Sequence, residues 1–231
     1  MNTTRLASVT IVLASLTTAS IAFAQGAPAK DPLPGRMPGL RLPPRMEKPA
    51  GPVKVGSWAE FSVLDVRAKT RMRLHWALVG KEAGSGSWWE LTFRKPRQPS
   101  LRIKLLGKGS GNNPEELLRV ILQTGQSTPL ELPLKQGQRV MDMYIRRGDA
   151  SGFKDLGAVR LITPAGTFQT RHHRWRDPDG QLVEEWTSPA AAIWGMVRFR
   201  TSRFELELIG QGEGATSRIR GAPRKWHIPG L

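Results

Sequence analysis

The chain has 231 residues, of which 39% are hydrophobic, enough to build one packed domain. It contains no cysteine, which excludes disulfides, thiolate metal sites, a cysteine nucleophile and lipidation at a cysteine. Its 35 Lys and Arg residues against 19 Asp and Glu give a formal charge of +16, which excludes an acidic solvating protein and favours an anionic partner.

The first 24 residues have the pattern of a signal peptide. Arg5 precedes an uncharged, apolar segment, residues 6–23, and Ala22 and Ala24 form the small-x-small arrangement that signal peptidases cleave. An uncleaved membrane anchor is the alternative, but the segment lies at the short end of the lengths that cross a bilayer. We therefore expect cleavage after Ala24, no transmembrane span in the mature chain, and a periplasmic or secreted location in a bacterium.

Two segments flank the body of the chain and carry much of its charge. Residues 25–54 are rich in proline and glycine and show no hydrophobic period, which predicts a disordered linker. Residues 218–231 contain no acidic residue and are predicted to form a basic C-terminal tail. Linker and tail each carry a net +4 and Arg5 carries +1, so the body keeps +7 of the formal charge of +16.

Residues 55–217 are predicted to form a single β-rich domain. Hydrophobic and polar residues alternate in one segment after another, which is the pattern of antiparallel strands with one buried and one solvated face. Turn residues such as Asp177-Pro178-Asp179-Gly180 separate these segments. The alternating segments include 71–78, 89–94, 101–105, 141–145 and 204–208.

One segment, Asn113 to Thr124, predicts a helix instead. Asn113 suits the N-cap and Pro114 suits the first helical position. An apolar stripe follows at helical spacing, formed by Leu117, Leu118, Ile121 and Leu122. A single amphipathic helix among many strands must cover the apolar face of their sheet. The predicted fold class is therefore α+β, mostly antiparallel β: a curved sheet or half-barrel covered by one short amphipathic helix.

Two motifs resemble elements of exported bacterial proteins of unknown function. Residues 163–168, Thr-Pro-Ala-Gly-Thr-Phe, look like the Pro-Ala-Gly-Thr-Phe turn that opens a strand in those proteins. Residues 194–197, Trp-Gly-Met-Val, look like their Trp-Gly-Leu-Val strand start. The order of these elements, over roughly residues 55–219, is similar to the layout of the bacterial lipoprotein carriers LolA and LolB. This resemblance implies a half-barrel that encloses an apolar cavity.

The tryptophan content raises the question of a ligand in the interior. The chain has 8 Trp and 1 Tyr, and the neighbours Trp88 and Trp89 must face opposite sides of a strand. One of them therefore lies outside the core or in a groove. Core packing accounts for most of the tryptophans, and an apolar cavity for acyl chains is the functional alternative. The predicted lining residues are Trp76, Trp89, Phe93, Leu117, Ile121 and Trp194.

The basic residues predict contact with an anionic surface. For an exported protein the expected polyanions are lipid headgroups or lipopolysaccharide, and the sequence has no nucleic-acid-binding motif. A basic surface that serves only solubility is the alternative. The predicted contacts are Arg171, Arg174, Arg218, Arg220, Arg224 and Lys225.

No catalytic or metal site is predicted. His172 and His173 face opposite sides of a strand and cannot bind one metal ion together. Glu205 and Glu207 share a strand face, as a glycosidase pair would, but their pattern is that of an ordinary solvated face. No nucleophile or phosphate-binding motif is complete, so no cofactor is expected.

These features together favour a non-catalytic exported binding protein. Its half-barrel would hold a lipid or the acyl chains of a lipoprotein, and its basic rim and tails would dock to the anionic envelope surface. The alternatives are an envelope hydrolase that uses His172 or His173 as its base and a purely structural envelope protein. The sequence indicates neither the ligand nor the oligomeric state.

Overall fold

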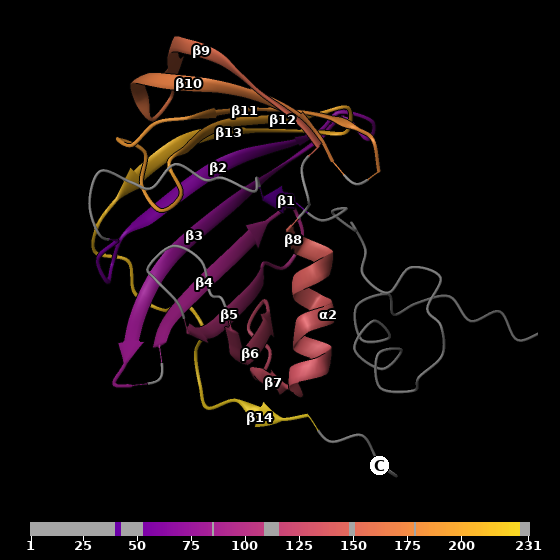
Figure 1. Cartoon of the computed structure of the whole chain (residues 1–231). Helices are drawn as coiled ribbons and strands as arrows, with labels where there is room; N and C mark the ends of the chain where they lie inside the picture. The colour runs from indigo at the N-terminus through magenta and orange to yellow at the C-terminus, as the bar shows by residue number, and fades with distance from the viewer. Residues whose placement is uncertain are drawn as a thin grey trace, which may run out of the picture. The chain divides into compact units, whose positions relative to one another are not determined.

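The computed structural model describes residues 40–42, 53–84, 86–108, 116–147, 151–177 and 179–226, all of which belong to one compact unit, Gly39–His227. The predicted signal peptide and most of the predicted linker lie outside the described residues. Figure 1 shows the unit as a long curved sheet with one helix beside it.

Twelve strands form a single open sheet in the order β14-β7-β6-β5-β4-β3-β2-β13-β12-β11-β10-β9. The described neighbours pair antiparallel, except that β14 runs parallel to β7. The prediction of a mostly antiparallel, curved β-sheet is therefore confirmed. The strands of this sheet are β2 (Trp58–Asp65), β3 (Thr70–Glu82), β4 (Gly86–Arg94), β5 (Leu101–Lys108), β6 (Glu116–Thr124), β7 (Leu130–Leu132), β9 (Ser151–Thr163), β10 (Gly166–Arg176), β11 (Leu182–Thr187), β12 (Met196–Thr201), β13 (Phe204–Gly212) and β14 (Arg224–Lys225); β1 (Leu40–Leu42) and β8 (Ile145–Arg147) form a separate parallel pair, and helix α2 spans Leu134–Tyr144.

The two faces of the sheet differ in composition. We call inner the face that carries Trp76 of β3, and outer the face that carries its neighbour His75. The register places Leu91 of β4 opposite Trp76 and Thr92 opposite His75, so each face continues from strand to strand. The inner face is the hydrophobic core that the alternation predicted. Its fully buried side chains include Phe61, Leu74, Leu78, Trp89, Leu91, Ile103, Leu105 and Leu206.

The prediction of a helix over residues 113–124 is wrong. Glu116–Thr124 is strand β6, which lies between β5 and β7, and the predicted cap residues before it lie outside the described residues. Val120 on the inner face and Ile121 on the outer face are both buried, because both faces of β6 are covered. A strand buried on two sides has a continuous apolar run, and such a run matches a helical stripe as well as it matches a strand.

The helix lies later in the chain, at α2, where alternation of Met141, Met143 and Ile145 had predicted a strand. Gly137, Val140 and Met141 are buried and follow the i, i+3, i+4 spacing of one helix face. A Cβ on Gly137 would lie 2.6 Å from Cγ2 of Val120, so the missing side chain lets α2 approach β6 closely. Figure 1 shows α2 beside the β5, β6 and β7 end of the sheet.

Both turn motifs that the sequence emphasised connect neighbouring strands. Thr163 ends β9, and Gly166 begins β10 with a φ of +132°, which a residue with a Cβ rarely adopts. Between β10 and β11, Oδ1 of Asp177 accepts hydrogen bonds from the backbone N–H groups of Asp179 and Gln181, both at 2.9 Å. The turn predicted at this point is confirmed, and it connects two antiparallel strands as a hairpin.

The end of the chain crosses the outer face. Residues 213–226, which we call the C-terminal strap, leave β13, contact β4 and β6 in turn, and end beside β7 as β14. The strap includes residues 218–226 of the predicted basic tail. Its passage explains why His75, Glu90 and Thr92 are buried although they occupy the polar face.

Candidate anion-binding face

Four of the six residues predicted to line an apolar cavity meet on the inner face. Trp76, Trp89 and Phe93 lie on the paired strands β3 and β4, and the ring of Trp194 contacts that of Trp76 edge-on. Their exposed fractions run from 1% for Trp194 to 8% for Phe93, so they form part of the core.

The other two predicted lining residues lie on β6. Ile121 is buried at 6% exposure, but it lies opposite Lys104 of β5 and therefore on the outer face. Leu117 is half-buried near the beginning of β6, opposite Gly107 of β5. Both residues were assigned to a helix that does not form, and a strand distributes its side chains differently from a helix.

Over β10–β13 the outer face carries alternating charges in register. Arg174 donates to Glu184 on the next strand at 2.8 Å, Arg200 donates to Glu205 at 3.0 Å, and Arg198 pairs with Glu207. These cross-strand pairs neutralise one another. We call this region the paired half of the outer face.

Over β3–β6 the outer face has an excess of positive charge. Arg73 of β3 lies directly opposite Arg94 of β4, a like-charge arrangement that destabilises a sheet. The nearest described carboxylate to Arg73 is Glu60, at 3.9 Å. At the β6 end of this region, Arg119 pairs with Glu131 at 2.9 Å. Among the described residues, Arg71, Arg94, Arg102, Lys104 and Arg218 have no carboxylate at ion-pair distance. We call this region the basic half, formed by Arg71, Arg73, Arg94, Arg102, Lys104 and Arg218.

The strap fixes Arg218 in the basic half through a buried carboxylate. Glu90 is 2% exposed and accepts hydrogen bonds from Ser217 Oγ at 2.7 Å and from the backbone N–H of Arg218 at 2.9 Å. On β6, Gln123 Oε1 accepts from the backbone N–H of Arg220 at 3.3 Å, and its Nε2 donates to the Arg220 carbonyl at 3.2 Å. The backbone of the strap is thus held at two strands.

The pKa of His75 reflects the positive charge of this region. His75 is stacked on Trp58, with ring centroids 5.5 Å apart, and its Nε2 lies 3.3 Å from Nη2 of Arg218. Burial, followed by the charges of Arg218 and Arg94, lowers the pKa of His75 to about 4. His75 is therefore neutral at pH 7, and its Nε2 can accept the hydrogen bond from Arg218.

The same positive charge also affects the pKa of Arg218. Burial, and then the nearby charge of Arg94, lowers the pKa of its guanidinium from the usual value, although Glu90 opposes this effect. Its Nη1 is buried and has no hydrogen-bond partner among the described residues. An anion placed between Arg94 and Arg218 would relieve their repulsion and supply an acceptor for that donor.

An aromatic residue adjoins the basic half. Trp88 is half-buried on the outer face, whereas Trp89 is 2% exposed in the core, as their opposite orientations predicted. Nζ of Lys104 lies 4.8 Å from the Trp88 ring and the guanidinium of Arg119 lies 5.3 Å from it. Both cations are held over the π-face.

The predicted anionic-surface contacts fall into two groups. Arg171 and Arg174 are each engaged within the sheet, the former with Asp155 at 2.5 Å and the latter with Glu184. The strap residues lie nearer the basic half, with Arg224 and Lys225 exposed on β14. The sequence reasoning missed the basic cluster on β3–β5, although basic residues at alternate positions of the predicted strands, such as Arg71 and Arg73, were a visible signal.

The two adjacent histidines lie on opposite faces, as predicted. His172 faces Trp186 and stacks on it, with centroids 4.3 Å apart, and its Nε2 lies 3.4 Å from Glu184. His173 is buried on the inner face, opposite Glu185 of β11. Glu205 and Glu207 form ion pairs with Arg200 and Arg198.

In the described part of the chain no three His, Cys, Asp or Glu residues are grouped as metal ligands would be. No helix among the described residues is long and apolar enough to cross a membrane.

Comparison with known proteins identifies no family. No family model and no curated protein matches the chain. Two crystal structures are similar to 70% of this chain, each at 12% sequence identity. One is a candidate lipoprotein from Parabacteroides distasonis, with a TM-score of 0.38 and 97% of its own chain covered. The other is a candidate exported protein with a YmcC-like fold from Bacteroides fragilis, with a TM-score of 0.37 and 98% of its own chain covered. These values assign neither a family nor an activity to the chain.

Proposed function

We propose that this chain is an exported, non-catalytic binding protein that docks to an anionic surface of the bacterial envelope through the basic half of its outer face. The observation that carries this proposal is the direct opposition of Arg73 and Arg94 beside the partly buried Arg218. Like charges gathered in this way raise the free energy of the unbound protein. An anion that enters the group recovers that cost, so the arrangement favours binding.

The chemistry of the basic half suits lipid headgroups. Its cations are spread over three strands and the strap, and Trp88 offers an amphipathic ring of the kind that sits at the headgroup level of a membrane. Each Lys or Arg near an anionic membrane contributes about 1 kcal/mol to binding, and the sum weakens as salt screens it. Export rests on the signal-peptide pattern of residues 1–24.

Vesicle binding tests this proposal. The chain from Gln25 onward should bind phosphatidylglycerol vesicles and not phosphatidylcholine vesicles. Replacing Arg73 and Arg94 together by Gln removes two contacts and should weaken binding by about 2 kcal/mol, or roughly 30-fold. The matched control replaces Arg174 and Arg200 by Gln, which removes the same charge from the paired half.

Only the variant in which Arg73 and Arg94 are replaced should lose most of its binding to the anionic vesicles. Equal loss in both would mean that total charge, and not the basic half, governs docking. Absence of binding to either kind of vesicle at low ionic strength would remove the proposal.

A lipid held in the interior remains the hypothesis that the sequence and its resemblance to lipoprotein carriers raised. Trp76, Trp89, Phe93 and Trp194 occupy one face, which supports it, but their side chains are packed against the core, so an acyl chain would have to displace them. Native mass spectrometry of protein purified from the envelope should retain a lipid under this hypothesis. A protein that is consistently empty would leave docking through the basic half as the function.

A further inference from the structure

Strand β9 forms an exposed edge of the sheet. Among the described strands it pairs only with β10, and Figure 1 shows it as the outermost strand. Four of the seven exposed large hydrophobic residues in the described part of the chain lie on it: Phe153, Leu156, Val159 and Ile162, with exposed fractions of 38%, 42%, 36% and 72%. Alternate backbone N–H and C=O groups of such a strand point away from the sheet and seek partners.

We propose that β9 pairs antiparallel with β9 of a second copy of this chain, about a twofold axis between Gly157 and Ala158. In this register Phe153 lies opposite Ile162 of the partner, Leu156 lies opposite Val159 of the partner, and Asp155 lies opposite Arg160 of the partner. Twofold symmetry repeats each pair, so all four exposed apolar residues and two ion pairs are matched at once.

A β-bulge makes this register geometrically consistent. In a regular strand, residues 155 and 160 would face opposite sides and could not meet across a twofold axis. In β9 the register with β10 shifts between Asp155, which lies opposite His173, and Ala158, which lies opposite Arg171; Arg160 then lies opposite Gln169. Because these β10 residues alternate along one face, Asp155 and Arg160 share that face of β9.

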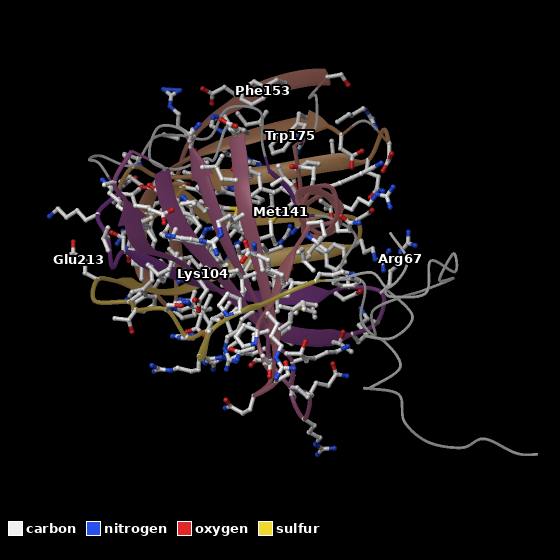
Figure 2. All side chains as sticks on the ribbon, turned by 90° about the horizontal axis from the view of Figure 1, so that it is seen from below. Arg67, Lys104, Met141, Phe153, Trp175 and Glu213 are labelled. Carbon is white, nitrogen blue, oxygen red and sulfur yellow. The ribbon has the colours of Figure 1, made fainter. Side chains whose placement is uncertain are left out.

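The same shift aligns the apolar residues. Phe153 contacts His173 and Trp175, with ring centroids 5.1 and 6.5 Å away, so it belongs to the face of Asp155; Figure 2 shows Phe153 and Trp175 at the same end of the molecule. Ile162 lies opposite Thr167, which places it on that face as well. Val159, opposite Thr170, lies on the other face.

The charges select this register over its neighbours. Oδ1 of Asp155 accepts from the N–H of Gly157 at 2.9 Å and Oδ2 accepts from Arg171 at 2.5 Å, which leaves lone pairs for a further donor. Arg160 is exposed and has no carboxylate at ion-pair distance among the described residues. A shift of two residues in either direction would place Asp155 opposite an apolar residue, Ala158 or Ile162, and both ion pairs would be lost.

Charge reversal tests the pairing. The chain from Gln25 onward should sediment as a dimer whose dissociation constant rises roughly tenfold or more in Arg160→Asp and in Asp155→Arg, because each substitution creates two like-charge pairs. Mixing the two variants should restore the dimer, since every pair across the axis then joins an acid to a base. Leu182→Lys, which changes an exposed hydrophobic residue away from this edge, is the control and should leave the dimer intact.

Crosslinking tests the register in a chain that has no cysteine of its own. In Ala158→Cys the two introduced thiols lie within one residue of each other across the axis and should form a disulfide-linked dimer. In Ile162→Cys they lie about nine residues apart along the strands, or roughly 30 Å, and should not. Circular dichroism confirms that each variant is folded.

A wild-type chain that remains a monomer at its highest soluble concentration overturns the proposal. So does failure of the two charge variants to form a mixed dimer, and so does preferential crosslinking through residue 162. Loss of vesicle binding in the basic-half variant has no bearing on these measurements, since Arg73 and Arg94 lie on strands far from β9 in the sheet order.

Discussion

Both halves of the outer face contain arginines at alternating strand positions, yet the surroundings of these arginines differ. Over β10–β13, Arg174, Arg198 and Arg200 each have a glutamate directly across the strand or close to it. Over β3–β6, Arg73 has another arginine across from it. In the paired half the charges stabilise the sheet locally, whereas in the basic half they repel one another.

The effect of charge on a sheet therefore depends on cross-strand register and not on composition alone. Charged side chains directly opposite each other on neighbouring strands interact, whereas a carboxylate two strands away contributes little. The C-terminal strap accentuates the contrast, because it adds Arg218 to the basic half and places Glu90 beneath its own backbone. Predictions that change one half and use the other as control test this account.

Removing the buried carboxylate under the strap should have the largest effect. Glu90→Ala leaves the N–H of Arg218 and the hydroxyl of Ser217 without their acceptor in a buried place, and should lower the free energy of unfolding by about 2–4 kcal/mol. Glu184→Ala in the paired half removes a partly exposed carboxylate and should cost about 1 kcal/mol or less. Urea denaturation measures both, and equal losses would contradict the anchoring role of Glu90.

Acid should destabilise the basic half through His75. Its pKa of about 4 in the folded state lies below the value of about 6.5 expected when unfolded, so the unfolded state binds the proton first as pH falls. The stability is fully present above pH 6.5 and is lost progressively toward pH 4, by about 1–3 kcal/mol. His75→Gln should flatten this dependence.

The control for His75 lies in the paired half. Burial lowers the pKa of His172, but the neighbouring Glu184 opposes that shift, so His172→Gln should leave most of the pH dependence in place. Denaturation curves between pH 4 and 7 and imidazole NMR titrations follow both. An imidazole of His75 that titrates near 6.5 would contradict the positive field described here.

The same substitution should have opposite signs in the two halves. Arg94→Glu replaces a repulsion with an attraction to Arg73 and should stabilise the fold by about 0.5 kcal/mol. Arg200→Glu places a third carboxylate beside Glu184 and Glu205 and should destabilise it by about 0.5–1 kcal/mol. Thermal unfolding of the two variants at low salt gives the comparison, and shifts of equal sign would refute it.

Salt should produce the smallest effect. Raising ionic strength from 0.01 to 0.15 M shortens the screening length from about 30 to about 8 Å and weakens the repulsion in the basic half. The wild-type chain should gain roughly a few tenths of a kcal/mol of stability, and Arg94→Glu should gain less. Equilibrium unfolding at the two salt concentrations measures the difference.

Local patterns predicted most of the strands but placed the helix wrongly. Alternation around Leu74 and Leu91 is a property of neighbouring residues, and it survives in the structure because those strands bury one side in the core. Val120 and Ile121 are both buried, so β6 lost the alternation that marks a strand. The role of Gly137 becomes visible only in the structure, where the side chain of Val120 occupies the space that a Cβ on residue 137 would need.

The candidate site was predicted less well for the same reason. The sequence indicated excess positive charge and a preference for anionic partners, but it located that charge on flexible ends and on Arg171 and Arg174. In the structure those two arginines have acidic partners, and the unpaired cations lie on β3–β5 instead. Which strand neighbours which is a long-range property that spacing along the chain does not reveal.

Local sequence patterns were sufficient to predict the β-rich class, the turn at Asp177, and the opposite faces of Trp88 and Trp89 and of His172 and His173. Each of these features depends on residues that are close along the chain. Tertiary structure alone decided that Arg73 meets Arg94, that Glu90 is buried beneath the strap, and that the charges of β10–β13 are paired. These contacts span very different distances along the chain, from 5 to 10 residues for the charge pairs of β10–β13 to 128 residues for Glu90 and Arg218. Their energies depend on cross-strand register and burial, which exist only once the sheet has formed.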